Sequence, residues 1–147
     1  MSSKLPSPLA GQDGPRGRIG RFASPAWTWL GLRELMLGEG SATVEMTATE
    51  DMANSAGFVH GGMISALADS AMGRALHTIK PGVVRAMSFD LKLSFISAAK
   101  VGETLRATGQ VVHAGRRTGV TECRIEGSDG RLVATASGTF AMTRETE

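Results

Sequence analysis

Residues 54–62 read Asn-Ser-Ala-Gly-Phe-Val-His-Gly-Gly, and Asp69 follows seven residues after the last of these glycines. We expect a helix to begin at the two glycines, where its first backbone N–H groups have no partner within the helix and can bind a carbonyl oxygen or an anion. Asp69 lies among apolar and small residues of that helix, where a carboxylate is costly to bury without a function. This pattern predicts an enzyme that polarises a carbonyl and attacks it with an activated water or with the carboxylate.

Each of these residues has a simpler interpretation. Asp69 could lie on the solvated side of an amphipathic helix, and Asn54 is common in turns. A lone histidine such as His60 could be no more than a polar residue that ends a loop. Two observations favour the functional interpretation. His60 directly precedes two glycines at the helix start, and the helix face of Asp69 is small and uncharged, which indicates close packing of another backbone; it comprises Gly62, Ser65, Ala66, Gly73 and Leu76.

The spacing between Gly61 and Asp69 indicates that two chains share a site. Eight residues of helix rise by about 12 Å. One carbonyl needs its hydrogen-bond donor and its attacking group each within roughly 3 Å of the reacting atoms. Two antiparallel copies of the helix around a two-fold axis would bring the start of one helix to the middle of the other. The spacing therefore predicts a dimer with shared sites.

The elements that must position these residues form an α+β pattern. The helix is expected over residues 61–78, with an apolar stripe of Ile64, Leu67, Ala68, Ala71, Met72 and Ala75. Strands are expected over residues 30–37, 41–49, 83–96, 103–114, 118–126 and 131–142. The third of these strands alternates, with Met87, Phe89, Leu91, Leu93 and Phe95 on one face. We expect one curved antiparallel sheet wrapped around one long helix.

Composition narrows the function further. The 147 residues suit one domain, residues 26–147, preceded by a Ser-, Pro-, Gly- and Arg-rich flexible arm at residues 1–25 that could become ordered against a partner subunit. A net charge of +2 does not favour nucleic acid, and no apolar run is long enough to span a membrane. One cysteine, Cys123, and no apolar leader segment favour the cytoplasm.

Several kinds of site are disfavoured by what the chain lacks. His77 and His113 are distant in sequence and no cysteine pair exists, so no metal site is expected. No serine has a G-x-S-x-G context, and no glycine-rich nucleotide motif opens a helix after a strand.

The segment from Asn54 to Asp69 resembles the signature of hotdog-fold acyl-CoA thioesterases of the phenylacetate-pathway type. It matches N-x2-G-x2-H-G-G with an Asp seven residues later. The similarity extends across roughly residues 27–142, and includes the Leu30-Gly31 pair and residues 95–103 and 130–134. The resemblance implies a hotdog fold and hydrolysis of an acyl-CoA thioester.

The resemblance also implies roles for residues. Asp69 would be the nucleophile or general base, and the backbone N–H of Gly61 would polarise the thioester carbonyl. Asn54 and His60 would orient the substrate or water from the subunit opposite Asp69. Ser88 is the candidate to hold the water, because some members place a serine or threonine near the start of the long strand.

Coenzyme A would be part of the substrate, and no cofactor is expected. The turn Gly115-Arg116-Arg117 resembles the family's contact with the coenzyme A phosphates, and Gly62 would also contact coenzyme A. A solvated turn is the alternative for Arg116 and Arg117. The expected partner is a second copy of the chain, with a homotetramer formed as a dimer of dimers.

Two other functions are possible on the same fold. One is a non-catalytic acyl-CoA-binding or regulatory module, although a sensor would need no activated carboxylate such as Asp69. The other is a dehydratase or hydratase, which would normally have an Asp and a His spaced for proton transfer on one loop; that pattern is absent from this sequence. No residue pattern identifies the acyl group.

Overall fold

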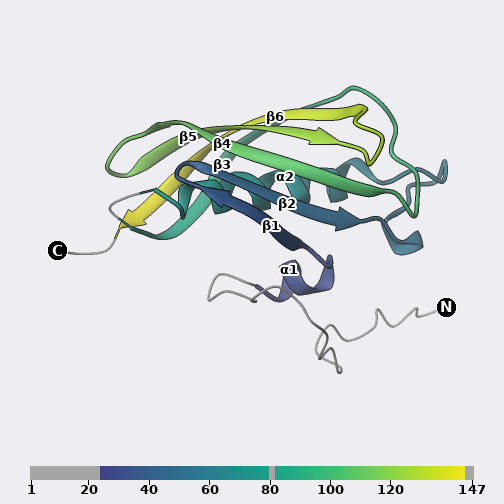
Figure 1. Cartoon of the computed structure of the whole chain (residues 1–147), viewed down its shortest axis with the longest axis horizontal. Coiled ribbons are helices and arrows are strands. Elements are labelled where there is room, and N and C mark those ends of the chain that lie inside the picture. Colours follow the sequence, from purple (N-terminus) through teal and green to yellow (C-terminus); the bar gives the residue numbers. More distant parts are fainter. Residues whose placement is uncertain (1–23, 80–81, 145–147) are drawn as a thin grey trace.

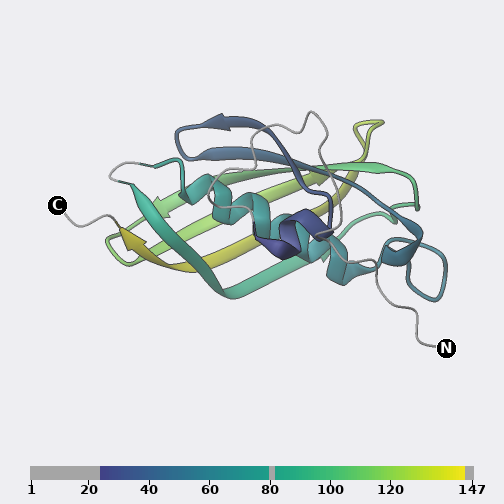
Figure 2. The same cartoon turned by 90° about the horizontal axis from the view of Figure 1, so that it is seen from below.

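The computed structural model describes residues 24–79 and 82–144. The elements in chain order are α1 (Pro25–Trp29), β1 (Arg33–Gly38), β2 (Ser41–Thr47), the 3-10 helix η1 (Glu50–Met52), α2 (Gly61–Leu76), β3 (Val83–Phe95), β4 (Thr104–Ala114), β5 (Thr118–Glu126) and β6 (Leu132–Arg144). The six strands form one antiparallel sheet in the order β1-β2-β4-β5-β6-β3. The sheet curves along α2 and stays open (Figures 1 and 2). The expected architecture is confirmed.

Helix α2 lies against the concave face of the sheet through the predicted apolar stripe, all of which is buried. Gly109 of β4 allows an unusually close approach. A Cβ atom there would lie 2.6 Å from the carbonyl oxygen of Ala71, a distance that real Cβ atoms essentially never show. The missing side chain at Gly109 therefore sets the depth of the middle of α2 in the sheet.

Strand β3 forms one edge of the sheet and pairs only with β6. Its register shifts between Ser88 and Asp90, which places a β-bulge at Phe89. The strict two-residue alternation predicted from the sequence is therefore interrupted at this point. Much of the apolar surface of the strand and of the residue after it is exposed: Val84, Met87, Phe89, Leu91, Phe95 and Ile96.

Two expectations from the sequence need correction, and a third lies almost entirely outside the described residues. The strand expected from Leu30 begins only at Arg33, because residues 25–29 form α1, which is capped by Ser24 and has Pro25 in its first turn. Leu76, which follows Asp69 by seven residues on the same side of the helix, is fully buried in the core of its own chain and does not face another backbone. The predicted arm, residues 1–25, lies outside the described residues except for its last two.

Candidate functional site

The loop before α2 is built by Asn54. Its side-chain Oδ1 accepts hydrogen bonds from the backbone N–H groups of Ala56, at 3.0 Å, and Phe58, at 3.1 Å. The backbone N–H of Asn54 donates to the carbonyl of Phe58 at 2.7 Å. Gly57 has a φ of 85°, which closes the turn between them. With Oδ1 used in this way, the Nδ2 amide is the part of Asn54 that can reach a ligand.

His60 caps the start of α2. Its Nδ1 accepts a hydrogen bond of 2.8 Å from the backbone N–H of Gly62. This bond assigns the neutral tautomer with hydrogen on Nε2, so that the exposed side of the ring can donate. The N–H of Gly62 is thereby occupied. The N–H of Gly61 has no acceptor within the described residues, and it lies at the positive end of the helix dipole.

A cavity of about 330 Å³ adjoins the middle of α2 and strand β3. Asp69 and Ser88 both line it, and so do Trp27, Ser70, Gly73, Arg74, His77, Ala86, Met87 and Phe140. The Oδ1 atom of Asp69 is buried and has no hydrogen-bond partner among the described residues. Buried polar atoms in native proteins are nearly always paired, so an orphaned carboxylate oxygen in a cavity indicates a site for a ligand or a water.

The cavity has an apolar side and a charged side. Trp27 of α1, Met87 of β3 and Phe140 of β6 provide apolar surface. On the charged side, Arg74 forms a half-buried ion pair with Glu34 of β1, and the ring Nδ1 of His77 lies 2.8 Å from the carbonyl oxygen of Gly73.

Sequence reasoning missed most of these lining residues. Gly73, already placed on the face of Asp69, and His77 follow Asp69 by four and eight residues, and this helical spacing is a signal that could have found His77. Ser70 and Arg74 extend the lining on the same helix. Trp27 gives no such signal, because it belongs to a separate short helix far away in sequence.

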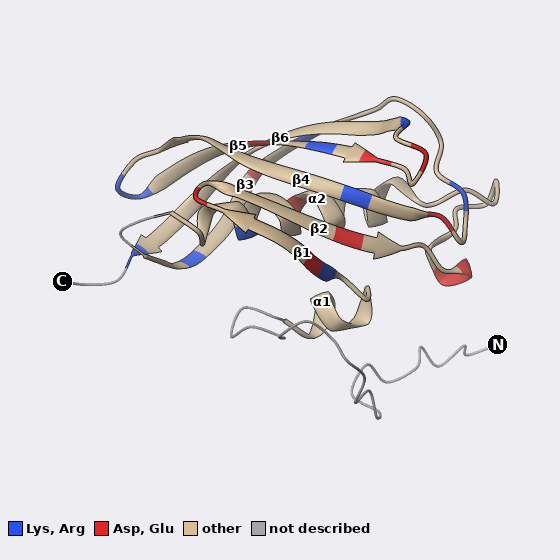
Figure 3. Cartoon of the chain, viewed as in Figure 1, with Lys and Arg blue, Asp and Glu red and all other residues tan. Residues whose placement is uncertain are grey.

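The structure brings the predicted residues into two groups and a separate turn. Asn54, His60, Gly61 and Gly62 lie together at the start of α2, and Asp69 and Ser88 lie together at the cavity. The exposed turn between β4 and β5, which has Arg116 and Arg117, lies at the far end of the sheet from the start of α2 (Figure 3). Arg144 reaches this turn through a 2.9 Å hydrogen bond from its Nη2 to the carbonyl of Gly115.

Two further observations limit the kinds of site. Within residues 24–79 and 82–144, no group of three or more His, Cys, Asp or Glu side chains could hold a metal ion. In the same part of the chain, no helix has the length and apolar character needed to cross a bilayer.

The chain is similar in sequence to proteins of one family. Residues 56–134 match the family model described as the thioesterase superfamily. The Escherichia coli K12 protein named acyl-coenzyme A thioesterase PaaI is 35% identical over 109 residues, which cover 74% of this chain and 76% of that protein.

Solved structures show the same fold. The structure of E. coli PaaI, from the phenylacetic acid degradation operon, superposes with a TM-score of 0.77 at 31% identity, covering 84% of this chain and 87% of that one. A Streptococcus mutans UA159 protein bound to acetyl CoA gives a TM-score of 0.72 at 25% identity, covering 79% of this chain and 91% of that one. The expected α+β hotdog fold is confirmed by this likeness.

Proposed function

Because the chain belongs to the thioesterase superfamily, we propose that it hydrolyses an acyl-CoA thioester to a free carboxylic acid and coenzyme A. The resemblance to the PaaI-type thioesterases is confirmed by the similarity to E. coli PaaI in sequence and in fold. The single observation behind the proposal is the buried, unpaired Oδ1 of Asp69 in a cavity. The S. mutans relative bound to acetyl CoA supports the choice of substrate carrier.

In the proposed reaction, the N–H of Gly61 donates to the thioester carbonyl oxygen and stabilises the negative charge that develops on it. Asp69 then acts in one of two ways. As a general base it takes a proton from water, the hydroxide adds to the carbonyl carbon, and the C–S bond breaks as the proton passes to the leaving thiolate. As a nucleophile it displaces the thiolate and forms an anhydride, which water then hydrolyses.

The remaining residues of the site would orient these groups. The Nε2–H of His60 and the Nδ2 amide of Asn54 are donors at the start of α2, suited to the substrate or to the water. Ser88 shares the cavity with Asp69 and would hold the attacking water there. The apolar side of the cavity, which includes Trp27, offers room for the acyl group.

We propose that the working site is formed by two chains. Gly61 and Asp69 lie on one continuous helix, about 12 Å apart along its axis, so one chain cannot present both to one carbonyl. The edge position of β3 supports a second copy as the partner. A second β3 would bury its exposed apolar side chains and hydrogen-bond the backbone groups along its free edge. The same strand paired across a two-fold axis is antiparallel to itself, like every other pair in this sheet.

The dimer would also explain the position of the basic turn, which is the turn between β4 and β5 with Arg116 and Arg117. In an antiparallel pair of helices, the loop before one α2 projects toward the end of the partner's α2. Arg116 and Arg117 lie far from residues 54–60 of their own chain (Figure 3). In the dimer they would be close to the partner's Gly61, and could bind the phosphates of the coenzyme A held at that site. Gly62 would contact coenzyme A without its N–H, which His60 occupies.

Two wider assignments belong to the same proposal. A homotetramer would form as a dimer of these dimers. A cytoplasmic location is supported by the single cysteine, Cys123, which leaves no possibility of an internal disulfide.

The experiment is a screen of aromatic and short- to long-chain aliphatic acyl-CoAs with detection of the released thiol. The protein's own thiol gives little background, because Cys123 is buried and its burial raises the pKa of the thiol to about 12. Thiol release that depends on Asp69 supports the proposal. Binding of acyl-CoA without any thiol release would instead assign the chain as an acyl-CoA-binding module.

A single turnover in ¹⁸O-labelled water separates the two roles of Asp69. A general base puts the label into the acid released in the first turnover. A nucleophile forms an anhydride, and water that attacks its Asp69 carbonyl releases an unlabelled acid and leaves the label on Asp69. Label on Asp69 after one turnover therefore identifies the nucleophile.

A further inference from the structure

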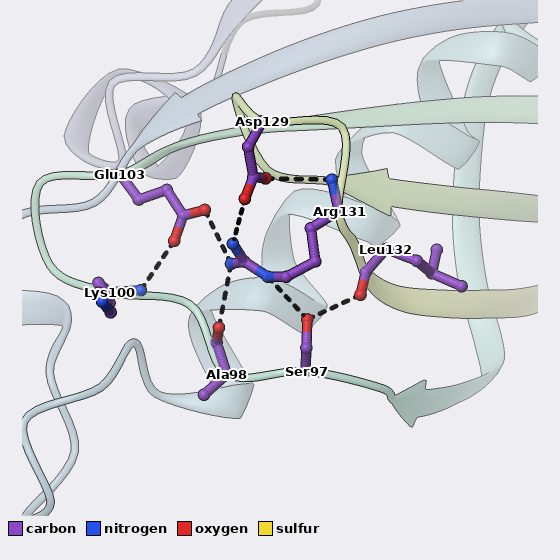
Figure 4. A network of polar contacts seen from close by, with 7 residues as sticks. All are labelled: Ser97, Ala98, Lys100, Glu103, Asp129, Arg131 and Leu132. Atoms are coloured by element: carbon purple, nitrogen blue, oxygen red, sulfur yellow. Dashed lines mark hydrogen bonds and ion pairs between the residues drawn. The ribbon is translucent and has the colours of Figure 1, made fainter.

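The guanidinium of Arg131 joins two segments of the chain (Figure 4). It donates to Asp129 Oδ2 at 2.9 Å, to Glu103 Oε1 at 2.8 Å, to Ser97 Oγ at 3.1 Å and to the carbonyl of Ala98 at 3.1 Å. These bonds use four of the five N–H groups of the guanidinium. Arg131 thus ties the connection between β3 and β4 to the turn between β5 and β6.

The carboxylate of Glu103 is the second centre of this cluster. Its side chain is only 12% exposed, and its Oε2 accepts a 2.9 Å hydrogen bond from the backbone N–H of Lys100. The backbone carbonyl of Glu103 accepts from the N–H of Ala48, just after β2. We name the set of Ser97, Ala98, Lys100, Glu103, Asp129 and Arg131 the arginine clasp.

The clasp holds the segment against which the loop before α2 is paired. The N–H of Val59 donates to the carbonyl of Ala99 at 2.9 Å, and Phe58 forms an antiparallel bridge with Lys100. Ala99 is buried, so this pairing is shielded from water. The Phe95 ring lies over Gly61, since a Cβ atom added to that glycine would be 3.1 Å from Phe95 Cζ. The end of the loop that leads into Gly61 thus contacts residues 95–100.

We propose that the arginine clasp positions the loop of residues 54–60, and through it the Gly61 N–H, so that Arg131 is a positioning residue for the carbonyl-polarising half of the site. This inference rests on the proposed function. Arg131 does not line the cavity, so its effect passes through the backbone pairing of Val59 and Phe58. Because a misplacement of about 1 Å can cost on the order of 10² in rate, the clasp can matter without touching the substrate.

Arg131→Lys is the sharpest variant. Lysine keeps the charge but cannot present a planar fork to several acceptors at once. Arg124→Lys is the matched control, because Arg124 pairs with Glu126 on β5 at 2.6 Å without contact to the loop. If Arg131→Lys folds poorly, Asp129→Ala is a milder lesion. It removes the two hydrogen bonds between Asp129 and Arg131 and leaves those of the guanidinium to Ser97, Ala98 and Glu103.

Two measurements are made on each folded variant, well below its thermal midpoint. The first is steady-state kinetics, which gives kcat and KM for acyl-CoA. The second is the hydrogen-exchange rate of the Val59 amide, relative to amides in the core strands. We expect Arg131→Lys to lower kcat by about tenfold or more, with KM within about twofold, and to speed Val59 exchange by about tenfold or more. Asp129→Ala should give smaller changes of the same kind, and Arg124→Lys should give none.

Each other result overturns the inference. Faster Val59 exchange with unchanged kcat would make the clasp purely structural. A lower kcat with unchanged exchange would rule out the route through the loop. If the wild-type chain releases no thiol from any acyl-CoA, the proposed function fails, and the exchange measurement then tests the clasp by itself: unchanged Val59 exchange in Arg131→Lys would overturn it.

Discussion

The polar side chains at the start of α2 and in the loop before it differ from Asp69, in the middle of the helix, in their hydrogen bonding. In the loop and the start of the helix, His60 Nδ1 and Asn54 Oδ1 both accept backbone hydrogen bonds, and Ser65 Oγ donates to the carbonyl of Gly61. In the middle of the helix, Asp69 Oδ1 is buried with no partner among the described residues. The same helix therefore has one region where polar side chains build the backbone and one where a carboxylate is left for a ligand.

This difference separates stability from chemistry along one helix. A polar group that is fully hydrogen-bonded contributes to the folded state, and its removal costs free energy of unfolding. A buried group without a partner is a cost to the folded state, and its removal is neutral or stabilising. Substitutions in the two regions should therefore differ in what they damage.

The largest effect is expected at Asp69. Asp69→Asn should lower kcat by at least about 10²-fold, the scale for loss of an acid/base or nucleophilic group, while the unfolding midpoint stays equal or rises. The measurements are kcat at saturating acyl-CoA and thermal unfolding. Asp51→Asn, at an exposed position in η1, is the control and should leave both unchanged. A folded Asp69→Asn protein with near wild-type kcat would contradict the mechanism.

Mixed dimers test whether Asp69 of one subunit works with Asn54 of the other subunit in one site. Subunits with Asp69→Ala and subunits with Asn54→Ala, each nearly inactive alone, should recover roughly a quarter of wild-type activity after exchange. With random pairing about half of the dimers are mixed, and each mixed dimer has one intact site of two. Subunit exchange is verified separately by mass spectrometry. Verified mixed dimers without any recovery would mean that both groups act within one chain.

The basic turn should affect substrate binding more than chemistry. Replacement of both Arg116 and Arg117 by Ala should raise KM for acyl-CoA by roughly three- to tenfold, with a smaller change in kcat, and should weaken the salt dependence of KM. The matched control is the double variant Arg106→Ala with Arg124→Ala. It removes two positive charges as well, but from within strands β4 and β5. An unchanged KM at low salt would assign Arg116 and Arg117 to a solvated turn.

The clearest effect on stability is expected at Asn54. Asn54→Ala removes two backbone hydrogen bonds and should lower the free energy of unfolding by about 1–2 kcal/mol. Asn54→Asp keeps the acceptor and loses only the Nδ2 donor, so it should unfold like wild type in a urea titration. If Asn54→Asp also has wild-type kcat, then Nδ2 does not orient the substrate, and Asn54 only builds the loop.

Local patterns in the sequence predicted much of this molecule. The helix from Gly61, its buried stripe and the antiparallel pairing of strands joined by short turns follow from periodicity and turn residues. The pairings of β2 with β4 and of β3 with β6 were not predicted. The segment from Asn54 to Asp69 was found because several chemically distinctive residues are close in sequence. The shared cavity of Asp69 and Ser88 was foreseen only through family resemblance.

The features that were missed depend on contacts between distant segments. Trp27 reaches the cavity from a short helix that tertiary packing stabilises, since five residues are too few for an isolated helix. The bulge at Phe89 depends on pairing with β6 and has no glycine to mark it. The arginine clasp joins positions 97 and 131, which no local window contains.

The pairing of β3 has a consequence for how the chain is made. This strand binds only β6, the last strand of the sequence, with Val83 opposite Arg144 and Phe95 opposite Ala134. A ribosome that has finished β3 must add roughly fifty more residues before β6 is complete, which takes on the order of 3–10 s at typical rates of synthesis. During that time both edges of an apolar strand are open in the nascent chain. Neighbouring ribosomes on one message would then hold such strands close together, and a second copy of the chain, as the proposed dimer needs, would be nearby when each β6 is completed.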